Sequence, residues 1–245
     1  MFTEIPAGSV MELLIRLLLA HMLGDFAFQS SGLVIMKKES WKGLAIHTLI
    51  VTVCTAALSW GYSPLWWAIT LVVSGSHMAL DAFRSSIPRA EPSREFLYFL
   101  GDQFLHLGLI LATVLAFERS LPRWDFASSA EIPLHLKVMI CFIAFIFLLW
   151  EVPLVERYVL DLLPSCYVPR ANFQIEPLQR LLGGIERTLF VLLFIMASPL
   201  AVILAFIPRA FTFTGGRWRC NLYRIGVSLA LTLPVTLLLM AISRE

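Results

Sequence analysis

The sequence predicts an all-α fold, a polytopic transmembrane helical bundle of about seven spans, within a range of six to eight. The first observation behind this prediction is composition: of 245 residues, 58% are hydrophobic and only 15% are charged. Soluble domains carry about a quarter charged residues, so this chain is too apolar for that class. The second observation is that apolar residues gather in runs of about 20, the length that a helix needs to cross a bilayer. The net charge of +2 gives no indication of nucleic-acid binding.

Seven apolar runs are candidate spans, and they are residues 9–28, 43–60, 64–83, 96–117, 134–151, 184–207 and 222–242. The chain starts with MFTEIPAGSV, which has no basic residue, so we expect a retained first helix rather than a removed signal peptide. The fifth run is the weakest, because it starts with polar residues and continues into a charged segment near 151–165. That segment is expected to be an amphipathic helix that either lies on the membrane or projects from it.

The runs divide the chain into two regions. Residues 1–117 are expected to form a four-helix transmembrane core, and residues 118–245 a C-terminal region with two or three further spans. Lys and Arg gather in the loops after the first and third spans, which by the positive-inside rule places the N-terminus in the periplasm. The Arg-rich segment 209–224 breaks this rule if all seven runs cross, so the orientation of the C-terminal half stays open. The four cysteines are far apart in sequence, and we expect them to be small apolar fillers.

Three of the first four spans carry a His/Asp pair at i, i+4 spacing, which places both side chains on one helix face. The pairs are His21/Asp25, His77/Asp81 and Asp102/His106, and the second span adds His47. Because successive spans run in opposite directions, all seven residues fall at one depth, near the predicted cytoplasmic surface. Candidate supporting residues at this level are Gln29, Gln103, Arg84, Glu186 and Arg187.

Charged groups in a bilayer are costly, so such residues usually face the bundle interior and pair with one another. Imidazoles and carboxylates together suit a divalent metal, with zinc as the first choice and iron or manganese as alternatives. The candidate metal ligands are the four histidines, His21, His47, His77 and His106. The candidate catalytic residues are Asp25, Asp81 and Asp102, one of which would act as the general base. A proton or ion relay and purely structural contacts between helices stay open as alternatives.

These motifs resemble a family of uncharacterised bacterial inner-membrane proteins, the domain of unknown function 3307. The resemblance rests on HMLGDFAFQ in the first span, the histidine of WKGLAIH in the second, HMALD in the third and DQFLH in the fourth. It covers about residues 11–116, and GGIER near residue 185 is similar to a downstream segment of longer family members. The resemblance implies an inner-membrane location and the motif positions named above. It implies no activity, because none is established for the family.

Three functions fit this pattern of residues. The first is a membrane-embedded, metal-dependent hydrolase that acts on a lipid or amphiphilic substrate, with Arg84 placed to hold a phosphate. The second is a cation or proton transporter that uses the same residues. The third is a non-catalytic membrane subunit whose contacts lie in the exposed loops 29–42, 84–95 and 152–183. The expected partners are membrane lipids and either a second copy of the chain or another membrane protein, with no nucleic acid.

Overall fold

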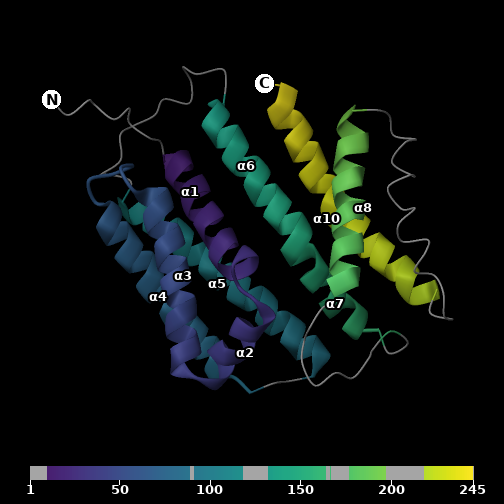
Figure 1. Cartoon of the computed structure of the whole chain (residues 1–245), viewed down its shortest axis with the longest axis horizontal. Helices are drawn as coiled ribbons and strands as arrows, with labels where there is room; N and C mark the ends of the chain where they lie inside the picture. Colours follow the sequence, from purple (N-terminus) through teal and green to yellow (C-terminus); the bar gives the residue numbers. More distant parts are fainter. Residues whose placement is uncertain are drawn as a thin grey trace. The chain divides into compact units, whose positions relative to one another are not determined.

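The computed structural model describes residues 10–88, 91–117, 132–163, 166, 177–196 and 218–244, and the regular elements in these ranges are helices (Figure 1). The predicted all-α class is therefore confirmed for the described part of the chain. The helices form two compact units, Met1–Arg89 with Leu97–Ile143, and Ala90–Phe96 with Ala144–Glu245.

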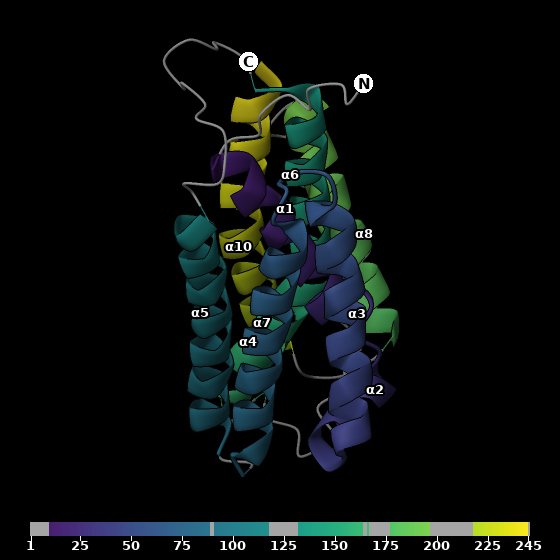
Figure 2. The ribbon, with the colours of Figure 1, turned by 90° about the vertical axis from the view of Figure 1, so that its left-hand side faces the viewer.

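The first unit contains the four helices that were predicted to form the core. Its elements are α1 (Val10–Met22), which continues as the π-helical segment η1 (Leu23–Ala27), α2 (Ser31–Glu39), α3 (Trp41–Ser59), α4 (Trp66–Ser86), most of α5 (Pro92–Phe117) and most of α6 (Leu134–Ile146). The helix α3 packs against both α1 and α4, and Figure 2 shows α3 and α4 side by side.

Each of the four core helices packs along one stripe of residues spaced by four. The stripes are Leu13, Leu17, His21 and Asp25; His47, Val51, Thr55 and Ser59; Ile69, Val73, His77 and Asp81; and Asp102, His106, Ile110 and Val114. In α1, α4 and α5 one half of the stripe is apolar, and these halves form a shared buried core. The polar halves therefore meet in the neighbouring layer, since residues four apart lie on one helix face.

The segment 29–42 was expected to be an exposed loop. Most of its residues are exposed, but the prediction of a loop is wrong because the segment is largely helical. It forms the short helix α2, which Ser30 caps by accepting a hydrogen bond from the Leu33 main-chain N–H at 3.2 Å. Ser40 caps α3 in the same way, and α3 begins one residue after Ser40. This sharp corner brings Gly43 against the main chain of Met36, where a side chain at position 43 has no room.

Within the described ranges, four helices are long and apolar enough to cross a membrane, and they are Trp41–Ser59, Ser93–Phe117, Leu134–Asp161 and Arg219–Ser243. They match the second, fourth, fifth and seventh predicted spans. The helix α1 with its continuation η1 falls short because it carries three charged residues, Glu12, Arg16 and Asp25, and α4 because it carries polar residues of the cluster. The sixth predicted span overlaps α8 (Pro177–Met196), and its remainder, 197–207, lies outside the described residues.

The second unit consists of the end of α6 with η3 (Phe147–Glu151) and α7 (Val152–Asp161), together with α8 and α10 (Trp218–Arg244). The amphipathic helix expected near 151–165 exists, but it is a continuation of α6 and not a separate surface helix. It buries Val152, Glu156 and Leu160 along one face and packs against α10.

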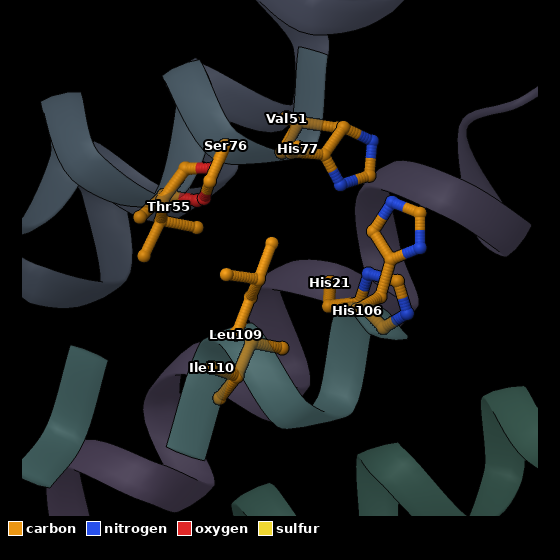
Figure 3. A pocket seen from close by; sticks show the side chains of 9 residues that line it. His21, Val51, Thr55, Ser76, His77, His106, Leu109 and Ile110 are labelled. Atoms are coloured by element: carbon orange, nitrogen blue, oxygen red, sulfur yellow. The ribbon is translucent and has the colours of Figure 1, made fainter. Parts of the chain in front are cut away.

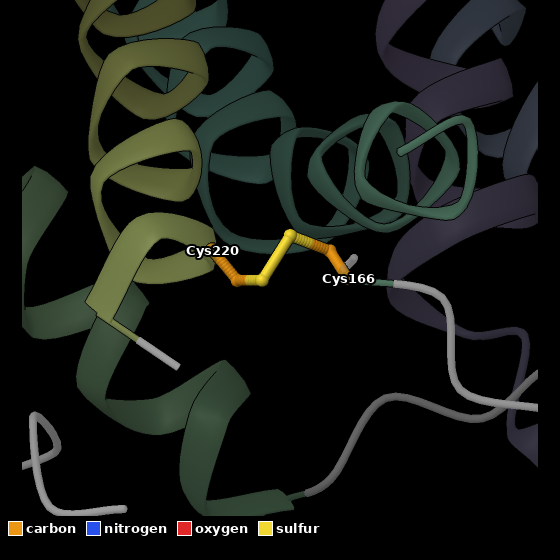
Figure 4. The surroundings of a disulfide bond; sticks show 2 residues. All are labelled: Cys166 and Cys220. Atoms are coloured by element: carbon orange, nitrogen blue, oxygen red, sulfur yellow. A yellow bond between two sulfur atoms is a disulfide. The ribbon is translucent and has the colours of Figure 1, made fainter. Parts of the chain in front are cut away.

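A disulfide joins Cys166 to Cys220, which connects the residues after α7 to the first turn of α10 (Figure 4). The interpretation of all four cysteines as isolated fillers is therefore wrong for this pair. The two cysteines are 54 residues apart in sequence, so no short motif indicated the pairing. Cys54 and Cys141 are free thiols.

We expect Gly43→Ala to destabilise the first unit, because the new methyl group would overlap the main chain of Met36. Overpacking of this kind usually destabilises a protein by about 1–3 kcal/mol. The melting temperature of the detergent-purified protein measures the effect. Gly101→Ala is the matched control, because open space surrounds position 101. Equal melting temperatures for the two variants would contradict the close approach of α2 and α3.

Candidate metal centre

Four donor atoms from η1, α3 and α4 converge on one point in the first unit. His47 Nε2 lies 3.1 Å from His77 Nε2, 3.3 Å from Asp25 Oδ1 and 3.1 Å from Asp81 Oδ2. His77 Nε2 lies 3.2 Å from Asp25 Oδ1 and 3.3 Å from Asp81 Oδ2. Asp25 Oδ1 and Asp81 Oδ2 therefore each lie 3.1–3.3 Å from the same two imidazole nitrogens. His47, His77 and Asp81 form one group, and His21, Asp25 and His77 another, in which one potential ligand atom from each residue lies within 4.8 Å of the others.

Pairs of donor atoms at these separations are compatible with joint coordination of a metal ion. Zinc ligands at about 2.0 Å from the metal, for comparison, lie about 3.3 Å from one another in a regular tetrahedron. The site is deeply buried, with His47 0% and Asp81 2% exposed. Two carboxylates in such a place need positive charge nearby, because a buried unpaired charge is strongly destabilising. The donor set therefore fits a divalent cation in both geometry and charge.

The hydrogen bonds on the far side of His47 turn its Nε2 lone pair toward this centre. With its amide oriented to satisfy both ends, Gln29 donates to the Asp25 main-chain oxygen at 3.0 Å and accepts from His47 Nδ1 at 3.3 Å. Since a carbonyl oxygen only accepts, Nδ1 carries a proton, and Nε2 is the nitrogen that faces Asp25, Asp81 and His77. A histidine whose other nitrogen is held in this way is typical of metal ligands. Gln29, predicted as a supporting residue, thus connects the Asp25 main chain to the His47 ring.

Lys37 is a member of the site that the sequence analysis missed. Its Nζ donates to Asp81 Oδ1 at 3.1 Å and to Asp81 Oδ2 at 3.0 Å, and Gln29 Oε1 also accepts from it at 3.1 Å. In the sequence, Lys37 belongs to a basic loop that indicates the orientation of the chain in the membrane. The helix α2 carries it back to the cluster, and no sequence signal indicated that helix.

The local structure around Asp25 is unusual for a helix. Asp25 lies in the π-helical segment η1, and such segments occur frequently at functional sites. The preceding residue, Gly24, lets η1 approach α3 closely, because a Cβ at position 24 would lie only 2.8 Å from Val51 Cγ2. Gly24 thus allows Asp25 to approach the imidazole of His47.

A second group of imidazoles borders the first. The rings of His21 and His106 stack with centroids 5.3 Å apart, and the His106 centroid lies 4.4 Å from that of His77. These three histidines lie along one side of a small pocket, with Leu109 and Ile110 also in its wall (Figure 3). The other lining residues are Val51, Thr55, Val73 and Ser76.

The remaining predicted residues of the first unit lie around this cluster. Asp102 and His106 belong to a group with Asp81 in which one potential ligand atom from each lies within 4.8 Å of the others. Gln103 donates to Asp102 Oδ2 at 3.3 Å. The Arg84 guanidinium lies over the Tyr98 ring, 5.4 Å from its centroid.

Glu186 and Arg187 lie in the second unit and are almost fully buried. Arg187 donates through Nε to the Leu148 main-chain oxygen at 2.6 Å and through Nη1 to Glu156 at 2.9 Å. Leu148 lies in η3, where π-helical geometry interrupts the regular hydrogen-bond ladder. Arg187 thus joins α8 to η3 and α7 within the second unit. The supporting role at the His/Asp cluster that the sequence predicts for Glu186 and Arg187 stays a prediction.

We expect Lys37→Met to lower the melting temperature of the purified protein, because Asp81 would lose its cationic partner inside the bundle. Removing one member of a buried ion pair typically destabilises a protein by about 3 kcal/mol or more. Lys38→Met is the matched control, because it removes the same charge from the exposed neighbouring position. Equal losses in the two variants would show that the Lys37–Asp81 pair contributes nothing to stability.

Three comparisons with known proteins were informative to different degrees. The searches of the curated proteins and of the solved structures find no match, whereas a protein-family model matches the segment that carries the motifs. Residues 13–132 match the family described as a protein of unknown function (DUF3307), while Glu186 and Arg187 lie outside the matched segment. The segment that carries the whole His/Asp cluster therefore belongs to the DUF3307 family, as its motifs indicated.

Proposed function

We propose that this protein is a membrane-embedded, metal-dependent hydrolase. In this proposal the chain crosses a bacterial inner membrane seven times, its N-terminus is periplasmic, and the His/Asp cluster lies near the cytoplasmic face. The observation that carries the proposal is that the Asp25 and Asp81 carboxylates each lie 3.1–3.3 Å from the Nε2 atoms of His47 and His77, beside a small pocket. The preferred metal is zinc, with iron or manganese as alternatives.

The four donors would divide into ligands and a base. Catalytic zinc sites keep three protein ligands and one open position, whereas four protein ligands close a site. Asp25, His47 and His77 would hold the ion. Asp81, which Lys37 binds through both of its oxygens, would accept the proton from the attacking water as general base. A bound divalent cation supplies Lewis acidity and favours deprotonation of that water.

The pocket supports a substrate with a small polar group attached to an apolar body. Its walls combine histidine rings and two hydroxyl groups with Val51, Val73, Leu109 and Ile110. An ester, amide or phosphodiester near a lipid headgroup has this chemistry. Arg84, which stacks on Tyr98 one turn beyond Asp81, would bind a phosphate of such a substrate.

A cation transporter is the second candidate. The observation that favours it is the complete set of four protein donors, which suits an ion that is carried or stored as well as one that reacts. A structural metal in a non-catalytic membrane subunit would use the same closed set. Zinc flux into proteoliposomes, measured beside hydrolysis of lipid esters and phosphodiesters, separates the three functions.

We expect about one or more equivalents of a divalent metal in the detergent-purified protein, measured by plasma mass spectrometry. Asp25→Asn and His77→Ala should lose metal, because each removes a donor atom from the converging set. His135→Ala is the matched control, since His135 is 51% exposed and contacts Glu12 rather than the cluster. A wild-type protein that contains no metal after anaerobic purification and reloading would contradict the proposal.

Asp81→Asn is expected to retain metal and to lose hydrolysis by about two orders of magnitude or more, because the amide cannot act as the base. Turnover of a lipid-ester substrate found in a hydrolase screen measures the effect, with metal content determined on the same sample. Full activity in this variant would remove Asp81 from the proposed mechanism.

A further inference from the structure

The pocket beside the Asp25, His47, His77 and Asp81 cluster is lined by two further histidines with buried ring nitrogens. We infer that His21 and His106 form a second position for a divalent cation, next to the one held by Asp25, His47 and His77. This inference rests on the proposed metal-dependent function, and it makes the centre dinuclear. Two adjacent metal ions are a recurring arrangement in enzymes that hydrolyse phosphate esters.

His106 presents a buried ring nitrogen with a lone pair. Its Nδ1 lies 2.8 Å from the Asp102 main-chain oxygen, which can only accept a hydrogen bond. Nδ1 therefore carries the proton, and Nε2 of the neutral ring presents a lone pair. That atom is buried and has no hydrogen-bond partner, in a residue that is 3% exposed.

His21 offers a second buried ring nitrogen to the same pocket. Its Nδ1 lies 3.6 Å from the Asp25 carboxylate, an ionic contact longer than a hydrogen bond. Its Nε2 is buried in a residue that is 5% exposed and makes no hydrogen bond at ordinary distance, although the side chain of Gln103 approaches the ring. Buried polar atoms are nearly always satisfied, so two such nitrogens beside one pocket mark it as a place for a ligand.

The two rings lie together. They stack with 22° between their planes and line the same pocket as His77 (Figure 3). Two imidazole lone pairs attract a borderline divalent cation such as zinc. The His106 ring is also held through Nδ1 by a main-chain oxygen, which is how proteins orient histidine ligands.

The Asp25 carboxylate lies between the two positions. It directs Oδ1 toward His47 and His77, and its Oδ2 lies toward His21. His21, Asp25 and His77 also form a group in which one potential ligand atom from each lies within 4.8 Å of the others. Carboxylates shared between two ions, with histidines on either side, are the usual construction of dinuclear centres in helical bundles.

The test is the zinc stoichiometry of the full-length protein after chelation, reloading with Zn²⁺ and removal of free metal. We expect two equivalents in the wild type and one in His106→Ala and in His21→Ala. Leu109→Ala is the matched control, because it enlarges the same pocket without removing a donor, and it should retain two. His106→Gln, which keeps a polar side chain of similar size, is measured beside His106→Ala in case the alanine variant fails to fold.

One equivalent in the wild type, unchanged in His106→Gln, would overturn the second position and leave the proposed function standing. No bound zinc in any sample would overturn both. Loading with Mn²⁺ gives an independent readout, since two neighbouring ions produce the electron paramagnetic resonance spectrum of a spin-coupled pair. We expect that spectrum in the wild type and an isolated-ion spectrum in His106→Gln. An isolated-ion spectrum in the wild type with two equivalents bound would contradict a shared centre.

Discussion

The carboxylates of Asp25 and Asp81 lie inside a helical bundle, each within about one hydrogen-bond length of the same two imidazole nitrogens. Buried charges of one sign are tolerated only where positive charge compensates them. Lys37 supplies part of that compensation at Asp81, and a divalent cation at the shared centre would supply the rest. The placement of α2, the tautomer of His47 and the π-helical geometry at Asp25 all serve this one electrostatic requirement.

The fold places these buried charges by dividing each inward helix face into an apolar layer and a polar layer. In α1, α4 and α5 the apolar half of each four-residue stripe packs into the core that includes Leu13, Ile69 and Val114. The polar half then has its depth and direction fixed by that packing, because it continues the same stripe. The packing of the apolar layer therefore positions the polar layer, and the polar residues need not hold the helices together themselves.

Much of the candidate site could be predicted, because it follows from helical periodicity. The i, i+4 pairs and the alternating direction of the spans indicated that His21, His47, His77 and Asp81 would meet. The place of Lys37 could not be predicted, since it depends on a short helix whose capping serines look like loop residues. The Cys166–Cys220 disulfide was missed because the contact joins distant segments of the chain. The division of the histidines into two groups depends on their nitrogen partners, which only the structure supplies.

The most direct test of the central claim is the X-ray absorption spectrum of the purified protein loaded with one equivalent of Zn²⁺. The account predicts about four nitrogen and oxygen neighbours at about 2.0 Å, with the outer-shell scattering of two imidazole rings and no sulfur. A spectrum of a hydrated ion without imidazole scattering, or one with sulfur neighbours at about 2.3 Å, would contradict it. In either case the convergence of Asp25, His47, His77 and Asp81 would need another explanation.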